Sequence, residues 1–303
     1  MKKILITGGT VFVSRYLAEH YVAKGYEVYV LNRNTKTQSD GVHLIEADRH
    51  KIGNLLDGIH FNLVVDTAYT KEDVECLTEA IYSYDDYVLI SSSAVYPETT
   101  AQPFLEEAPL GKNSIWGDYG TNKIEAENAL MKFDKKAYIL RPPYLYGPMN
   151  NVYREAFVFD QALSGKAFNL PKDGEMKLQF YYVGDLCRMI DEIMVQRPKQ
   201  HIFNVGNKEG ITIKEWVTLC YEAAGKEVAF RNIYEDIPYR EYFCFYEYEY
   251  ILDVERQNRI LQETTSMKDG LKEAFAWYQD HQMEVNRRKY KDFSEKNLDN
   301  YTY

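Results

Sequence analysis

The chain of 303 residues is long enough to bury a large core, as one large domain or two smaller ones. A hydrophobic share of 45% and a charged share of 27% are typical of a soluble globular protein. The net charge of −10 argues against nucleic acid as the main partner, because binding phosphates requires clustered lysine and arginine.

The cysteine spacing and the hydropathy pattern narrow the class further. The four cysteines lie far apart and show no paired spacing, so we expect reduced thiols rather than disulfides or a metal site. The first apolar strand begins close to Met1, which leaves no room for a signal peptide, and no apolar run approaches about 18 residues. These features predict a cytoplasmic protein without a membrane span.

The first turn of the chain is the strongest local signal. An apolar run at 4–6 predicts a buried strand, apolar residues at helical spacing predict a helix over 15–24, and 27–31 predicts a second strand. Strand, glycine turn, helix and strand within about 30 residues can hold a dinucleotide pyrophosphate at the helix N-terminus. The alternative is an ordinary crossover that binds nothing. The candidate cofactor ligands of this turn are Thr7, Gly8, Thr10, Val11, Phe12 and Val13.

The end of the second strand bears on the choice of cofactor. Asn32 and Arg33 stand where a carboxylate often binds the adenosine ribose. A guanidinium at this point can pair with a 2′-phosphate, so Arg33 favours NADP over NAD. The alternative is a solvated loop arginine.

Strands and helices continue to alternate. The sequence predicts strands over 43–47, 61–68 and 87–90, and a helix over 71–84. This alternation predicts an α/β fold of the Rossmann type, with a doubly wound parallel sheet and a ligand crevice at the C-terminal ends of the strands.

A group of hydroxyl and amino side chains follows the strand over 87–90. Ser91, Ser92 and Ser93 come at its C-terminal end, and Tyr119 and Lys123 lie one helical turn apart about 30 residues later. A phenol is a poor base at neutral pH, but a neighbouring ammonium favours the phenolate. Such a set can move a proton while hydride is transferred to or from a nicotinamide. The alternative is a surface Tyr/Lys pair beside a serine-rich turn.

Six motifs in order resemble an extended short-chain dehydrogenase/reductase of the NAD-dependent epimerase/dehydratase family. They are the turn over 7–14, Ala47-Asp48-Arg49, 91–96, 119–123, 140–148 and Val183-Gly184-Asp185-Leu186. The resemblance implies a Rossmann domain over 1–148 and 177–205, and a smaller, discontinuous substrate lobe over 149–176 and 206–303. It also implies a homodimer.

The resemblance assigns roles by position. It makes Tyr119 the catalytic acid/base, Lys123 its activator and ribose ligand, and Ser92 the catalytic hydroxyl. The remaining positions that it places at the cofactor are Asp48, Arg49, Thr67, Ala68, Tyr69, Ser91, Pro142, Tyr144 and Leu145. The positions that it places at the substrate are Ser93, Tyr144, Gln179 and Arg240.

Departures from the family pattern refine the expected reaction. Val11 and Ser14 replace loop glycines, although a subgroup related to chloroplast stem-loop RNA-binding proteins has a similar Gly-Gly-Thr-x-Phe turn. Ser93 and Ala94 stand where dehydratases carry an acid pair, which disfavours 4,6-dehydration. Leu178 stands where many relatives place a diphosphate-binding arginine, a role that Arg231 or Arg240 could take.

The sequence therefore predicts an NAD(P)-dependent epimerase or oxidoreductase acting on a sugar hydroxyl or ketone, most simply a nucleotide-linked sugar. The alternative is a cofactor-sensing or RNA-binding regulatory protein on the same fold.

The C-terminal part carries weaker signals. We expect helices over 153–163, after Asp185, and from about 211, where Thr212 caps the helix and Glu215 follows three residues later. A hairpin-like turn is expected at 172–175. The aromatic residues over 234–250 could form a stacking surface, but core packing is favoured. The charged tail after Asn286 is expected to be a frayed helix end or an interface.

Overall fold

The computed structural model describes residues 2–290 and divides the chain into two units. The first unit comprises Met1–Leu145, Phe180–Lys208 and Leu252–Thr264, and the second comprises Tyr146–Gln179, Glu209–Ile251 and Thr265–Tyr303. Both units are discontinuous, and Leu252–Thr264 returns to the first one. Specific contacts explain this return, because Leu252 forms a β-bridge with Phe104 and the Gln257 amide binds both backbone groups of Gly206, at 2.8 and 3.0 Å.

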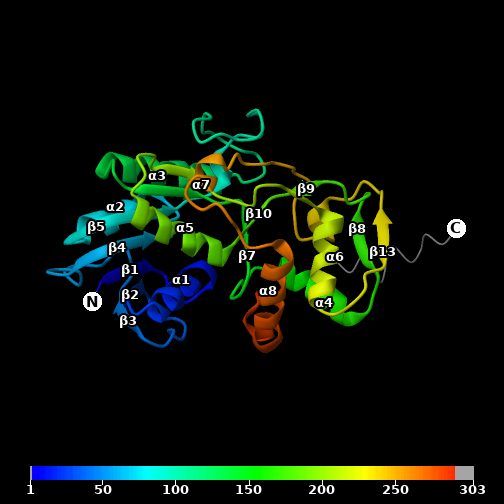
Figure 1. Ribbon diagram of the computed structural model, residues 1–303, viewed down its shortest axis with the longest axis horizontal. Coiled ribbons are helices and arrows are strands. Elements are labelled where there is room, and N and C mark those ends of the chain that lie inside the picture. Colours follow the sequence, from blue (N-terminus) through cyan, green and yellow to red (C-terminus); the bar gives the residue numbers. More distant parts are fainter. Residues whose placement is uncertain (1, 291–303) are drawn as a thin grey trace. The chain divides into compact units, whose positions relative to one another are not determined.

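Seven strands form the sheet of the first unit, with the order β11-β6-β5-β4-β1-β2-β3. Figure 1 labels five of them, β5, β4, β1, β2 and β3. All the described strand pairs in this sheet are parallel. The chain turns from one half of the sheet to the other between β1 and β4, which is the switch point where ligands bind in such folds. This confirms the predicted α/β class. The strands are β1 (Lys3–Thr7), β2 (Glu27–Asn32), β3 (Val42–Glu46), β4 (His60–Asp66), β5 (Ser83–Ile90), β6 (Tyr138–Arg141) and β11 (Ile202–Asn204).

Helices cover both faces of this sheet. Successive side chains of a strand point to opposite faces, so Ile4 and Ile6 face one core and Leu5 faces the other. The first core is closed by α1 (Phe12–Ala23) and α5 (Val183–Gln196), and the second by α2 (Lys71–Ala80) and α3 (Asp118–Phe133). Burial on both faces explains why the strands read as continuous apolar runs.

Several predicted boundaries are wrong. The helix expected over 71–84 ends at Ala80, because Ile81 takes an extended conformation, and β5 begins at Ser83 rather than at 87. The early start has a pairing reason, since Ser83 lies in register with His60 of β4. The strand expected over 61–68 ends at Asp66, and the residues after it form side-chain hydrogen bonds instead of strand pairs.

The second unit is built from helices and short strand pairs. Its β8 (Phe168–Pro171) pairs in parallel with β13 (Phe230–Ile233), and its β9 (Lys177–Leu178) pairs with β12 (Ile211–Thr212). Its helices are α4 (Glu155–Ser164), α6 (Ile213–Ala223) and α8 (Met267–His281), with the short η2 (Tyr239–Glu241) and η3 (Gln282–Glu284). The remaining elements are η1 (Ser93–Val95), β7 (Tyr144–Tyr146), β10 (Phe180–Tyr182), which pairs with β7, and α7 (Glu255–Asn258).

Several C-terminal predictions can now be decided. Thr212 and Glu215 form the predicted capping box at α6. The turn at 172–175 is present but joins no hairpin, because β8 and β9 pair with other strands. The aromatic segment packs mostly inside the second unit, which confirms core packing; its buried members are Tyr239, Tyr242, Phe243, Phe245 and Tyr250. The tail beyond 290 lies outside the described residues.

One negative finding concerns membranes. Over residues 2–290, no helix combines the length and the apolar character that a membrane span needs.

Candidate active site

The backbone between β1 and α1 forms a tight turn. Gly8 and Gly9 both take φ of +91°, and a Cβ on Gly9 would lie 2.5 Å from Val30 Cγ1. The Gly8 N–H donates to the Leu31 carbonyl at 2.9 Å, and the Asn32 amide donates to the Gly8 carbonyl at 2.6 Å. These hydrogen bonds hold the turn against β2, and the N-terminus of α1 points toward the C-terminal ends of the strands.

Val11 and Ser14, which replace loop glycines of the family pattern, fit into this turn. Val11 is the extended N-cap residue of α1, and Phe12 takes a positive φ of 36°, a strained conformation for a side chain of this size. The buried Ser14 donates its hydroxyl proton to the Val11 carbonyl at 3.0 Å. It also lies against Gly8, where a Cβ would come within 2.8 Å of Ser14 Oγ. Ser14 therefore fills the space under the turn.

The predicted ligands at the ends of β2 and β3 separate into two kinds. Arg33 and Asp48 are exposed, and the pKa of Asp48 is lowered, chiefly by the hydrogen bond from the His50 N–H. Asn32 and Arg49 instead make internal contacts. The Arg49 guanidinium binds the buried Asp66 carboxylate, with Nη2 at 3.1 Å from each oxygen.

The residues after β4 line the end of the sheet beside this turn. The Thr67 N–H donates to Thr7 Oγ1 at 2.9 Å, and Thr7 Oγ1 donates to Asp66 at 2.7 Å. Ala68 is buried, whereas Tyr69 is 42% exposed. Thr7 and Thr67 are therefore joined across the switch point between β1 and β4.

Tyr119 and Lys123 lie one turn apart near the start of α3, as predicted. The Tyr119 ring is 39% exposed and stacks on Tyr69, with ring centres 5.6 Å apart and planes inclined by 24°. The buried Lys123 ammonium donates to the carbonyls of Ala68 at 2.6 Å and Ile90 at 2.9 Å. Burial lowers the pKa of Lys123 to about 8, and the carboxylates of Asp66, Glu127 and Asp73 oppose that fall.

The three serines after β5 differ in their burial and in the hydrogen bonds that they form. Ser91 is buried and its hydroxyl donates to Glu127 at 2.5 Å. Ser92 is partly exposed and its Oγ accepts the Ala94 N–H at 3.2 Å, so this bond leaves the hydroxyl proton available. Ser93 is buried, and its N–H donates to the Pro142 carbonyl at 2.9 Å. Of the three, Ser92 is best suited to donate to a ligand.

A buried ion pair behind the serines was not recognised in the sequence. Arg141 of β6 binds Glu127 of α3 through two hydrogen bonds, with Nε at 3.0 Å and Nη2 at 2.6 Å. Its Nη1 also donates to the Tyr96 hydroxyl at 2.8 Å. The ion pair holds α3 against the sheet, and its Glu127 carboxylate also accepts the hydrogen bond of the Ser91 hydroxyl. The one available signal was an arginine that directly follows an apolar strand.

The predicted residues farther along the chain occupy both units. In the first unit, Pro142 and Tyr144 are buried and Leu145 is half-buried. Gln179 and Arg240 belong to the second unit. Gln179 is fully buried, and the Arg240 guanidinium donates to the Cys244 carbonyl and lies 5.1 Å from the centre of the Tyr246 ring.

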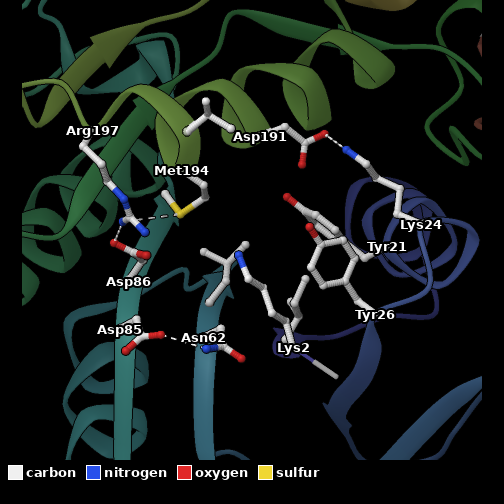
Figure 2. A pocket seen from close by; sticks show the side chains of 13 residues that line it. Lys2, Tyr21, Lys24, Tyr26, Asn62, Asp85, Asp86, Asp191, Met194 and Arg197 are labelled. Atoms are coloured by element: carbon white, nitrogen blue, oxygen red, sulfur yellow. Dashed lines mark hydrogen bonds and ion pairs between the residues drawn. The ribbon is translucent and has the colours of Figure 1, made fainter.

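A separate cavity of about 170 Å³ lies at the opposite end of the sheet (Figure 2). It is lined by the beginnings of β1, β4 and β5 and by the C-terminal parts of α1 and α5. Its lining contains two ion pairs, Lys24 with Asp191 at 2.7 Å and Arg197 with Asp86. The Tyr21 hydroxyl points into it, and burial raises the pKa of Tyr21. Its position separates it from Tyr119 and Lys123, which lie at the C-terminal ends of the strands.

No group of three or more side chains suited to a metal ion occurs among residues 2–290.

The glycine turn, the strand ends and the Ser/Tyr/Lys set together define a Rossmann-type nucleotide-binding protein. A profile of the NAD dependent epimerase/dehydratase family matches residues 4–86 and 74–206, more than half of the chain. The chain therefore belongs to this family, whose members are extended short-chain dehydrogenase/reductase enzymes.

The proteins that this chain resembles are named for different activities. The chain is 26% identical over 285 residues to the chloroplast stem-loop binding protein of 41 kDa b of Arabidopsis thaliana, covering 86% of this chain and 74% of the relative. It is 23% identical to the UDP-N-acetyl-alpha-D-glucosaminuronate decarboxylase of Bacillus cytotoxicus, covering 92% and 98%. Its fold matches the UDP-glucuronic acid 4-epimerase of Bacillus cereus, solved with UDP-glucuronic acid and NAD, with a TM-score of 0.71, 20% identity and coverage of 92% and 99%.

Proposed function

We propose that this protein is an NAD(P)-dependent epimerase or oxidoreductase acting on the hydroxyl or ketone of a nucleotide-linked sugar. The observation that carries the proposal is the arrangement of Tyr119 and Lys123 on α3 beside the ends of β4 and β5, with Ser92 directly after β5. Several relatives and structural neighbours are named as nucleotide-sugar enzymes, which supports the substrate class.

In this proposal Ser92 and Tyr119 act on the reacting oxygen of the substrate. The Ser92 hydroxyl donates a hydrogen bond to that oxygen and fixes its position. Tyr119 takes the proton from a sugar hydroxyl during oxidation and returns it to the carbonyl oxygen during reduction. Tyr119 is 39% exposed, so a substrate can approach this residue.

Lys123 maintains the charge that this proton transfer requires. Its ammonium, held by two backbone carbonyls, favours the phenolate of Tyr119 electrostatically. Asp66, Glu127 and Asp73 favour the charged lysine, although burial disfavours it. The buried carboxylates thus support the activation of the tyrosine through the lysine.

The residues at the β1–α1 turn suit a nicotinamide dinucleotide. In this proposal the pyrophosphate lies at the tight turn of the positive-φ Gly8 and Gly9 and at the N-terminus of α1, and Lys123 binds the nicotinamide ribose. When bound, the nicotinamide accepts or supplies the hydride. The exposed Arg33 favours NADP, since it is available for a 2′-phosphate.

The proposal is tested by cofactor binding followed by turnover. NADH and NADPH are titrated by fluorescence, and UDP- and dTDP-sugars are then screened by thermal shift and by NMR with the preferred cofactor present. We expect binding of a dinucleotide and interconversion of at least one sugar. The Tyr119→Phe variant should bind the cofactor with the same affinity and lose turnover, while Tyr82→Phe, at an exposed tyrosine, serves as the control. Absence of binding to both dinucleotides would refute the proposal.

RNA binding is a second candidate, favoured by one observation. The relative from Arabidopsis thaliana is named as a stem-loop binding protein, while the net charge of −10 opposes such a role. A gel-shift titration with a stem-loop RNA across salt concentrations separates the two functions. Salt-sensitive binding at physiological ionic strength would support RNA recognition.

We also propose a homodimer that pairs through α2 and α3. Their outer faces share an open hollow of about 680 Å³, and Phe133 at the end of α3 is 54% exposed. In this proposal the second copy covers the hollow and the Phe133 ring beside it. Sedimentation should give a dimer for the protein and a monomer for Phe133→Asp; a monomeric parent would refute this proposal.

A further inference from the structure

The four residues after β4 have their backbone N–H groups bound entirely by side chains. The Thr67 N–H donates to Thr7 Oγ1 at 2.9 Å, and the Ala68 N–H donates to Asp66 at 2.9 Å. The N–H groups of Tyr69 and Thr70 donate to Asp73 at 2.8 and 2.9 Å. Two carboxylates, Asp66 and Asp73, thus bind three of the four and hold the segment 67–70 from both ends.

Arg49 joins these two carboxylates. Its Nη2 lies 3.1 Å from both oxygens of Asp66 and donates to the Asp73 backbone carbonyl at 2.8 Å. Its Nε lies 3.5 Å from the Asp73 carboxylate. Asp66 is fully buried and Asp73 is 8% exposed, so the guanidinium provides the charge that two desolvated carboxylates require.

The clamped segment contacts both of the proposed catalytic residues on α3. The Ala68 carbonyl accepts the Lys123 ammonium at 2.6 Å. The next residue, Tyr69, stacks its ring on Tyr119. Two consecutive residues of one short segment therefore locate the lysine and the tyrosine that the proposed reaction uses.

We propose that Arg49 is a positioning residue that fixes segment 67–70 by joining Asp66 to Asp73, and thereby places Tyr119 and Lys123 for proton transfer. The proposal rests on the proposed function and assigns Arg49 a different role from that of a cofactor ligand. Its planar guanidinium places Nη2 on Asp66 and on the Asp73 carbonyl while Nε faces the Asp73 carboxylate, and the single nitrogen of a lysine ammonium cannot occupy both positions.

Arg49→Lys tests this role, because it keeps the charge and loses the planar fork. We expect the Kd for NADH to change little, and kcat at saturating cofactor to fall by about tenfold to a hundredfold. Arg259→Lys is the matched control, since Arg259 is exposed and pairs with Glu255 on the surface. A weaker NADH affinity with unchanged kcat at saturation would overturn the proposal and return Arg49 to the cofactor ligands.

A readout that needs no substrate separates this proposal from the proposed function. The phenolate of Tyr119 is titrated by ultraviolet absorbance, as the difference between each protein and the same protein carrying Tyr119→Phe. We expect Arg49→Lys to raise the midpoint, because Lys123 is displaced and its ammonium favours the phenolate less. An unchanged midpoint would overturn the positioning role, even if no sugar is turned over by the parent protein.

Asp73→Asn keeps the test decisive if Arg49→Lys does not fold. An asparagine retains an oxygen that can accept the N–H groups of Tyr69 and Thr70, but it removes the ion pair with Arg49. We expect a change of the Tyr119 midpoint in the same direction and of smaller size. Full retention of the parental midpoint and kcat in this variant would overturn the proposal.

Discussion

Gly120 lies so close to Ala94 that a Cβ at Gly120 would stand 2.3 Å from the Ala94 carbonyl oxygen. Gly120 follows Tyr119 on α3, and Ala94 belongs to η1, which begins directly after Ser92. The missing side chain thus lets the helix that carries the tyrosine approach the loop that carries the serine. This contact links two parts of the candidate site that lie 26 residues apart in the chain.

We predict that Gly120→Ala destabilises the protein by about 1–3 kcal/mol, because the obstructing atom belongs to the backbone. An alanine normally stabilises a helix relative to glycine by about 1 kcal/mol, so the expected sign is the reverse of the usual one. Denaturant unfolding measures the difference, with the exposed Asn128→Ala on the same helix as the control. An increase in stability would contradict the close contact.

The three serines should respond differently to substitution by alanine. We expect Ser92→Ala to lower kcat by about a hundredfold with little change in stability, since its proton is available to the substrate. Ser91→Ala should instead reduce the free energy of unfolding, because it removes a donor from the buried Glu127. Parallel kinetics and urea unfolding of both variants test this division. Equal loss of kcat in the two variants with no loss of stability would contradict it.

Activity should fall as the pH rises through about 8. Burial places the pKa of Lys123 at about 8, below its usual value, so the ammonium loses its proton above that pH. The loss removes the positive charge that favours the Tyr119 phenolate, and kcat declines on the alkaline side. The measurement is kcat against pH at saturating cofactor and substrate, with cofactor affinity followed over the same range. A profile that stays flat through pH 8 would show that Lys123 has another role.

The ion pair between Arg141 and Glu127 should dominate local stability. Both side chains are almost completely buried, so removing one partner leaves an uncompensated charge. We expect Arg141→Met to cost about 3–5 kcal/mol of unfolding free energy. Arg259→Met, which breaks an exposed pair, should change the unfolding free energy far less. Similar effects of the two variants would contradict the buried pairing.

Periodicity and motif order could predict much of this protein from the sequence. The apolar runs at 4–6 and 27–31 form the neighbouring strands β1 and β2. Residues on both faces of these strands are buried, which explains why the sequence is apolar there. The spacing of Tyr119 and Lys123 was sufficient to put both on one helix, since four residues make about one turn. Their place beside the ends of β4 and β5 follows from the parallel order of the sheet.

Contacts between distant residues could not be predicted in this way. Arg49 was assigned to the cofactor from its motif, yet its guanidinium binds Asp66, 17 residues further along the chain. Similarly, Ser91 and Glu127 are 36 residues apart. A single sequence does not show which distant residues pair with each other. A buried acid at the end of an apolar strand, such as Asp66, does indicate that a partner must exist, but not which residue it is.

The bound N–H groups of segment 67–70 have a consequence for how a ligand would lie across the sheet. This segment has no backbone donor left, so it can offer a ligand only oxygen acceptors and hydroxyl groups. The first turn of α1, by contrast, has N–H groups without intrahelical acceptors. The two neighbouring strand ends therefore have opposite hydrogen-bonding character. An asymmetric dinucleotide would find its phosphates matched at β1 and its ribose hydroxyls matched at β4, and the reverse orientation would satisfy neither.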